Sequence, residues 1–207
     1  MGAVMAASSA ARPPLAREPA ARAGILEFLA EPWLHPVEPR QTPGLRALGA
    51  LSPAEAVGLD FDPTALESAR TTFDLHLRVP GGRAFLPYET SHLPAGATPT
   101  GPTRLAQIAG IYATAGYELE PFTQFPADHL GHELRFLAAL ARREATATGD
   151  AAAHLVAWQA GFARDHAVIW LAPLVAHVER VTTTPLFPAL ARIARLVVGE
   201  IAELESG

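Results

Sequence analysis

The sequence predicts an all-α protein: a single helical domain of seven or eight helices, with a long Pro/Gly-rich loop in the middle. Apolar residues recur at spacings of three and four along much of the chain, which is the period of a helix with one buried face. Prolines repeatedly follow Ser, Asp or Thr, a pairing typical of a helix start. No run of β-branched and aromatic residues alternates with polar ones, so strands are not expected.

Helix starts can be assigned in order along the chain. Ser52 precedes Pro53 and lies three residues before Glu55, which predicts a capping box and a helix beginning there. Asp62-Pro63 repeats the device, and its helix has an apolar face of Leu66, Ala69, Phe73 and Leu77. Later helices are expected from Asp150, over 165–181, and from Thr184-Pro185.

The strongest helical pattern spans about 126–146. Leu130, Leu134 and Leu137 form one apolar stripe, widened by Phe136 and Leu140. By contrast, the segment 79–101 is rich in Pro and Gly and is long for a loop in a helical domain. Loops of that length are usually functional, so we expect this one to act as a lid or hinge.

Composition excludes several functions. The chain has 207 residues, 49% of them hydrophobic, and a formal charge of −5. It contains no cysteine and no lysine, which removes thiolate metal sites, cysteine nucleophiles, Schiff-base chemistry and the P-loop lysine. No run of basic residues offers a footprint for nucleic acid, and no apolar run approaches the ~20 residues of a membrane span.

The N-terminal residues 1–21 are small, broken by proline and lightly charged, so we expect a flexible tail ahead of a domain over 22–207. Their arginines follow the apolar part instead of preceding it, which does not fit a secretory signal. A cytoplasmic location is therefore expected.

Two polar motifs stand out: FLPYETSHL at 85–93 in the long loop, and FPADHLGHEL at 125–134 at the start of the strongest helix. If Pro126 is the first helical residue, Asp128 lies near the third and stabilises the positive end of the helix dipole. His129, His132 and Glu133 share one helix face and are an alternative metal-ligand set, although their order differs from the zincin pattern. A recognition role is the third interpretation.

In this order, on a helical chain of this length, the motifs resemble the TorD/DmsD/NarJ family of molybdoenzyme maturation chaperones. The landmarks are FDLHL at 73–77, PYET at 87–90, and PADHLGHELRFL at 126–137. The stretch 162–173 is similar to the family's penultimate helix. Thr90 stands where the family commonly has Ser, and His92 where Tyr is common.

The resemblance implies a TorD/DmsD-like fold and a cytoplasmic chaperone, not an enzyme, with no cofactor of its own. Its partner would be the apo catalytic subunit of a molybdenum oxidoreductase of the DMSO reductase family, held through its twin-arginine signal peptide until cofactor is inserted. The peptide-binding residues that it implies are Phe73, Leu77, Pro87, Tyr88, Thr90, Pro126, Asp128 and His129.

The chemistry of these residues agrees with that role. Paired guanidinium groups followed by an apolar stretch require carboxylates and an apolar groove. We expect Glu89 and Asp128 to supply the negative charge. The expected groove residues are Phe73, Leu77, Tyr88 and Leu93. The net negative charge also favours encounter with a basic peptide.

Other interpretations remain open at this stage. They are a chaperone that binds a different segment of its client, a helical metal-binding protein using His129, His132 and Glu133, and a helical interaction protein unrelated to molybdoenzymes. A monomer and a domain-swapped dimer are both compatible with the long loop.

Overall fold

The computed structural model describes residues 17–57, 62–78, 84–119 and 124–204. The described part is helical, and its β-type pairing is limited to one isolated bridge, between Tyr88 and His129. Eight of its α-helices have ten residues or more, which confirms the predicted all-α class and number. They are α1 (Pro19–Leu34), α2 (Thr42–Leu51), α3 (Pro63–Phe73), α5 (Gly101–Thr114), α6 (Leu130–Glu144), α7 (Gly149–Phe162), α8 (Val168–Val181) and α9 (Leu186–Ala202).

Shorter helical segments join these elements. The 3-10 turn Pro39–Gln41 precedes α2, and the π-helical turns Asp74–Arg78 and Ala163–Ala167 extend α3 and connect α7 to α8. The four-residue helix α4 (Glu89–His92) lies inside the expected 79–101 loop, so part of that segment is helical. The N–H groups of Glu89 and Thr90 in this helix donate to Asp128, which lies outside it.

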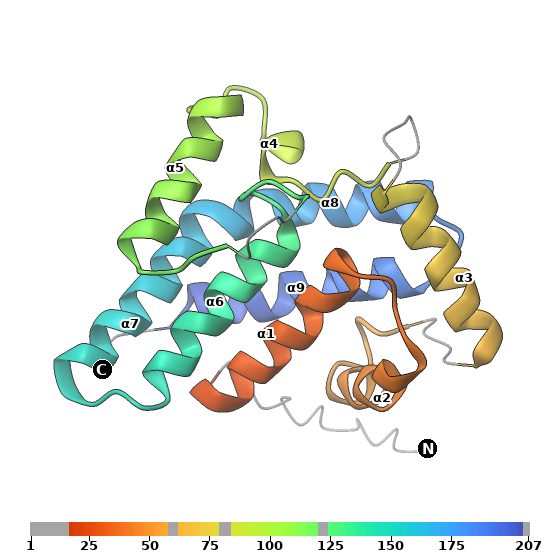
Figure 1. Cartoon of the computed structure of the whole chain (residues 1–207), viewed down its shortest axis with the longest axis horizontal. Helices are drawn as coiled ribbons and strands as arrows, with labels where there is room; N and C mark the ends of the chain where they lie inside the picture. Colours follow the sequence, from red (N-terminus) through yellow and green to blue (C-terminus); the bar gives the residue numbers. More distant parts are fainter. Residues whose placement is uncertain (1–16, 58–61, 79–83, 120–123, 205–207) are drawn as a thin grey trace, which may run out of the picture.

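The core lies where α1, α6, α8 and α9 meet (Figure 1). α1 lies alongside α6, while α9 packs against α8 and α1. Trp33 of α1 and Phe187 of α9 meet edge to face, with ring centroids 5.4 Å apart. Eleven residues of α9 are buried, the largest number for any helix of the described chain.

A buried arginine joins the N-terminal helix to the domain. Arg22 of α1 has no exposed surface, and it donates from Nε to Gln159 Oε1 at 3.0 Å and pairs with Glu144. α1 begins at Pro19, three residues before the position expected for the start of the domain. The first sixteen residues of the expected tail lie outside the described residues.

The expected helix starts are met in part. Asp62 caps α3 as predicted, because its Oδ1 accepts the Ala65 N–H at 2.7 Å. The capping-box helix at Ser52 is wrong: Ser52 ends α2 by donating its N–H to Leu48 O at 3.1 Å, and turns follow. α6 begins at Leu130 instead of 126, since the chain before it is extended at His129.

Two further starts shift slightly. α7 begins at Gly149 with Thr148 as its N-cap, which places Asp150 in the first turn instead of at the cap. α9 begins at Leu186, and Thr184 bonds to other threonine side chains instead of capping it. No described helix is both long enough and apolar enough to cross a membrane.

Candidate functional site

The two motifs found in the sequence lie against each other. The Glu89 N–H donates to Asp128 O at 2.9 Å, and the Leu130 N–H donates to Pro87 O at 2.8 Å. Tyr88 and His129 form the isolated antiparallel bridge between them. The loop that precedes α4 is therefore fastened to the start of α6 by backbone hydrogen bonds.

Asp128 serves α4 instead of its own helix. Its Oδ2 accepts the Thr90 backbone N–H at 3.1 Å and the Thr90 hydroxyl at 2.6 Å. The expected position of Asp128 inside the first turn of its helix is wrong, because Asp128 precedes the N-cap of α6. With only 1% of its surface exposed, the carboxylate acts as an N-terminal cap for α4 supplied from another element.

His129 is the N-cap of α6. Its Nδ1 accepts the Gly131 N–H at 3.1 Å, and its ring stacks on Phe125 with centroids 4.3 Å apart. Burial, aided by the neighbouring His132, lowers the pKa of His129 well below its usual value, so the ring is neutral. Its Nε2 has no hydrogen-bond partner among the described residues.

Glu89 is at the centre of a buried polar cluster. Its side chain has no exposed surface, and it accepts from Arg104 Nε at 2.6 Å and contacts His166 Nδ1 at 3.1 Å. Arg104 also donates from Nη2 to Asp165 O at 2.6 Å. The cluster thus joins α4 to α5 and to the π-helical turn before α8.

Glu133 contributes a second buried carboxyl group. Its Oε2 accepts the Trp170 indole N–H at 3.2 Å, whereas Oε1 has no partner within the described chain. Burial first, and then the charge on Glu89, raise the pKa of Glu133 well above its usual value. The Glu133 carboxyl group therefore stays protonated to a higher pH than a solvated glutamate does.

The alternative metal set is not assembled. No group of three or more His, Asp or Glu side chains among the described residues is placed to hold a metal ion. His129 uses Nδ1 to cap its helix, and Glu133 faces Trp170. The spacing that suggested ligands instead reflects one buried helix face.

Sequence reasoning missed the partners of these carboxylates. Arg104 and Tyr112 were not singled out, although the Tyr112 hydroxyl donates to Ala127 O at 2.9 Å beside the motif. His166, which contacts Glu89, was likewise not predicted to take part in the site. No local spacing links these residues, because they come from separate helices.

His92, at the end of α4, is half-buried. Its Nε2 lies 2.9 Å from Leu86 O, and its ring stacks on Trp170 with centroids 6.0 Å apart. Leu86 has a positive φ of 47°, unusual for leucine, and is 42% exposed. The loop therefore turns sharply between the buried Phe85 and Pro87 and presents Leu86 to solvent.

Exposure divides the residues that were expected to bind peptide. Phe73 and Leu77 are buried in the hydrophobic core on α3 and the turn that follows it. Asp128, His129 and Glu89 are enclosed as described, and Pro87 is buried. At the surface of the joined motifs lie Tyr88 and Thr90, both half-buried, and the exposed Pro126. We call these three residues the junction surface.

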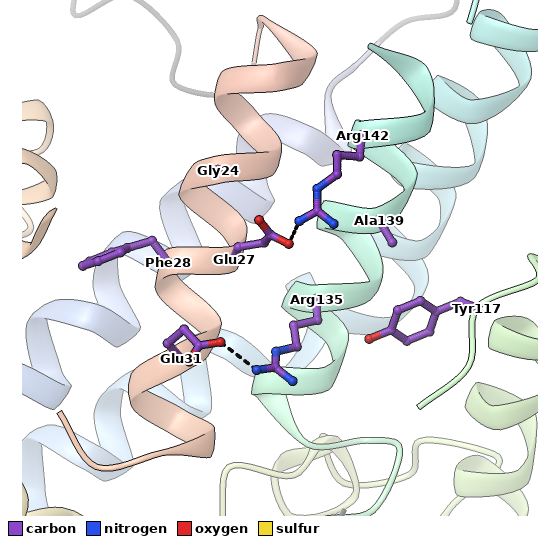
Figure 2. A pocket seen from close by; sticks show the side chains of 8 residues that line it. All are labelled: Gly24, Glu27, Phe28, Glu31, Tyr117, Arg135, Ala139 and Arg142. Atoms are coloured by element: carbon purple, nitrogen blue, oxygen red, sulfur yellow. Dashed lines mark hydrogen bonds and ion pairs between the residues drawn. The ribbon is translucent and has the colours of Figure 1, made fainter. Parts of the chain in front are cut away.

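A separate surface pocket lies between α1 and α6 (Figure 2). It has a volume of about 560 Å³ and is crossed by two ion pairs, Glu31 with Arg135 at 2.6 Å and Glu27 with Arg142. Each arginine thus has a carboxylate beside it, so the two pairs carry no net charge. These pairs link α1 to α6, and none of the residues expected to bind a client lies here.

Fold and site together describe a helical protein in which buried acidic groups position one loop at the surface. The family model described as "Nitrate reductase delta subunit" matches residues 43–176. That span exceeds half of the chain, so the protein belongs to this family of NarJ/TorD-type chaperones, which assist the maturation of redox enzymes. The resemblance drawn from the sequence is confirmed. The comparisons with curated proteins and with solved structures returned no match.

Proposed function

We propose that this protein is a cytoplasmic chaperone for the catalytic subunit of a molybdopterin oxidoreductase. It binds the twin-arginine signal peptide of the apo subunit and delays export until cofactor is inserted. The observation that carries the proposal is the family membership over 43–176, a span that includes both sequence motifs.

The junction surface is our candidate for the first contact with the client. Tyr88 offers an aromatic ring, Pro126 an exposed apolar surface, and Thr90 a hydroxyl held in place by Asp128. The Asp128 carboxylate is hydrogen-bonded to Thr90, and the Glu89 carboxylate is hydrogen-bonded to Arg104. In this conformation the two carboxylates therefore affect client binding by holding α4 in place, not by contacting the client's arginines. Direct pairing with those arginines requires α4 to move away from α6.

Co-purification tests the function. A tagged form of this protein is expressed in its host together with a molybdenum oxidoreductase catalytic subunit, either complete or lacking its leader. We expect the complete apo subunit to be retained and the leaderless one to be largely lost. Full retention of the leaderless subunit would instead favour a chaperone that binds another segment, and failure to retain either form contradicts the proposal.

Titration of the leader peptide tests the site. Tyr88→Ala is expected to weaken binding several-fold, because an aromatic side chain at an interface contributes far more than average. Leu51→Ala is the matched control, since Leu51 is an exposed apolar residue on α2. Equal losses in the two variants would remove the junction surface from the site.

Asp128 should act through Thr90. Asp128→Ala is expected to weaken leader binding several-fold, and Thr90→Val, which removes the hydroxyl at the same hydrogen bond, to weaken it in the same direction. If the two residues act through this shared bond, the double variant binds about as well as Asp128→Ala. Strictly additive losses would indicate that Asp128 contacts the peptide by itself.

A further inference from the structure

A second pocket lies between α3 and the turn that joins α8 to α9. Its volume is about 700 Å³, and hydroxyl side chains line both of its walls. We call it the threonine pocket; Ser68, Thr71 and Thr72 come from α3, and Thr182 and Thr184 from the turn. It is distinct from the junction surface, with which it shares no residue.

The floor of the threonine pocket is ordered by hydrogen bonds. The hydroxyl of Thr72, a buried residue, donates to Ser68 O at 2.8 Å and lies 3.1 Å from the Thr184 hydroxyl. The Thr182 hydroxyl is 2.9 Å from the same Thr184 oxygen. The rim hydroxyls of Thr71 and Thr183 are exposed. Because a hydroxyl both donates and accepts, such a rim suits the N–H and C=O groups of an extended peptide.

The two ends of the threonine pocket differ in chemistry. Glu67 is the carboxylate in the lining, no arginine lines the pocket, and Glu67 makes no ion pair with any described residue. At the other end, Leu75 is 59% exposed. Glu67 and Leu75 are eight positions apart on a helical segment, a rise of about 12 Å, which an extended chain spans in roughly four residues.

The threonine pocket is connected to the loop that carries the junction surface. His76 lines the pocket, and its ring stacks on Phe85 with centroids 4.6 Å apart. The Phe85 N–H also donates to His76 O at 2.9 Å. Since Phe85 is three residues before Tyr88, a polypeptide bound in the pocket lies close to that surface.

We propose that the threonine pocket binds an extended segment of the client polypeptide. A basic side chain pairs with Glu67, the backbone bonds to the rim hydroxyls, and an apolar side chain about four residues away packs on Leu75. This inference rests on the proposed chaperone function and adds the location and the sequence pattern of the bound segment.

Fluorescence anisotropy with labelled synthetic peptides tests the inference. One peptide has two arginines followed four positions later by two leucines, and its partner peptide has glutamines in place of the arginines. Glu67→Gln is expected to weaken binding of the arginine peptide about threefold, within the range for an exposed ion pair, and to leave binding of the glutamine peptide unchanged. Leu75→Ser is expected to weaken both peptides. Glu67 and Leu75 are exposed, so neither change should disturb folding.

Matched control variants distinguish binding at the threonine pocket from the general effect of losing a negative charge or an exposed leucine. Glu118→Gln and Leu51→Ser remove an exposed carboxylate and an exposed leucine elsewhere on the chain, and are expected to leave both affinities unchanged. Charge reversal is the sharper test: Glu67→Arg should bind a glutamate version of the peptide better than the unaltered protein does. Such a rescue requires direct contact.

Three outcomes overturn the inference: no binding of the arginine peptide to the unaltered protein, equal affinities for that protein and the Glu67→Gln/Leu75→Ser double variant, or no rescue on charge reversal. Retention of the oxidoreductase subunit then distinguishes the two proposals. If the unaltered protein and the double variant retain it equally, the pocket is not the site but the chaperone function stands. If neither retains it, the chaperone function fails.

Discussion

Arg104→Met removes the guanidinium group that Glu89 binds, while preserving much of the apolar part of the side chain. Glu89 would then keep a carboxylate with no exposed surface, next to the buried Glu133 and with His166 as its remaining close partner. Removing one member of a buried ion pair typically costs about 3–5 kcal/mol, because the remaining charge is neither solvated nor paired. Asp165 O also loses the donor that lies 2.6 Å from it.

For a domain of this size, each kcal/mol corresponds to a fall of about 2–4 °C in melting temperature, so we expect a decrease of roughly 6–20 °C. Urea denaturation followed by far-UV circular dichroism measures the free energy of unfolding directly. The Glu89→Gln/Arg104→Met double variant should recover at least half of the loss, since it removes both charges of the buried pair and the glutamine can still bond to His166. A double variant no more stable than Arg104→Met would refute the reasoning and assign the cost to packing.

Three other tests, one of them with a control variant, concern the electrostatics and packing around the buried Glu89 cluster. Glu133→Gln should raise the melting temperature at about pH 8 and have little effect near pH 4.5. Because the pKa of Glu133 is raised in the folded protein, folding takes up a proton. The free energy of unfolding of the unaltered protein therefore falls as the pH rises above 4.5. A difference that does not grow with pH contradicts this. His129→Asn keeps an N-cap acceptor but cannot titrate; because burial lowers the pKa of His129 below 6.5, the unaltered protein should lose more free energy of unfolding than the variant between pH 7 and about 5. Equal losses in urea denaturation would show that His129 is not responsible. Gly131→Ala would place a Cβ 2.4 Å from Leu34 Cγ and should cost about 1–3 kcal/mol, whereas Gly24→Ala meets nothing within 4 Å and should gain about 0.5–1 kcal/mol. Thermal denaturation that shifts both variants in the same direction would contradict the clash.

Local patterns identified most of the fold. Asp62 caps α3 because the signal and its target amide are three residues apart, so no distant contact is required. The apolar stripe of α6 was recognised for the same reason, although its first residue was placed four positions too early. Ser52 shows where local patterns fail. Serine is compatible with a helix start and with a helix end, and in this fold Ser52 is the C-cap of α2.

The candidate site was predicted in its parts but not in its arrangement. The sequence pointed to both motifs, and the structure brings Glu89 and Asp128 into adjoining positions. The sequence did not indicate that Arg104 forms an ion pair with Glu89, or that Asp128 caps α4 instead of facing solvent. Ion pairs between residues distant in sequence depend on how helices pack, which single-sequence periodicity does not encode.

The sequence alone determined that this protein is helical, where most helices lie, and which family its motifs resemble, because periodicity, capping and short motifs act within a few residues. The tertiary structure decided which acidic groups are enclosed and which surfaces remain open. Burial is a property of the packed chain: Glu89, Asp128 and Glu133 are enclosed where four helical elements converge, whereas Glu67 stays at the rim of a pocket. A carboxylate therefore holds a loop in place where packing buries it, as at Asp128, and stays accessible to solvent where it does not, as at Glu67.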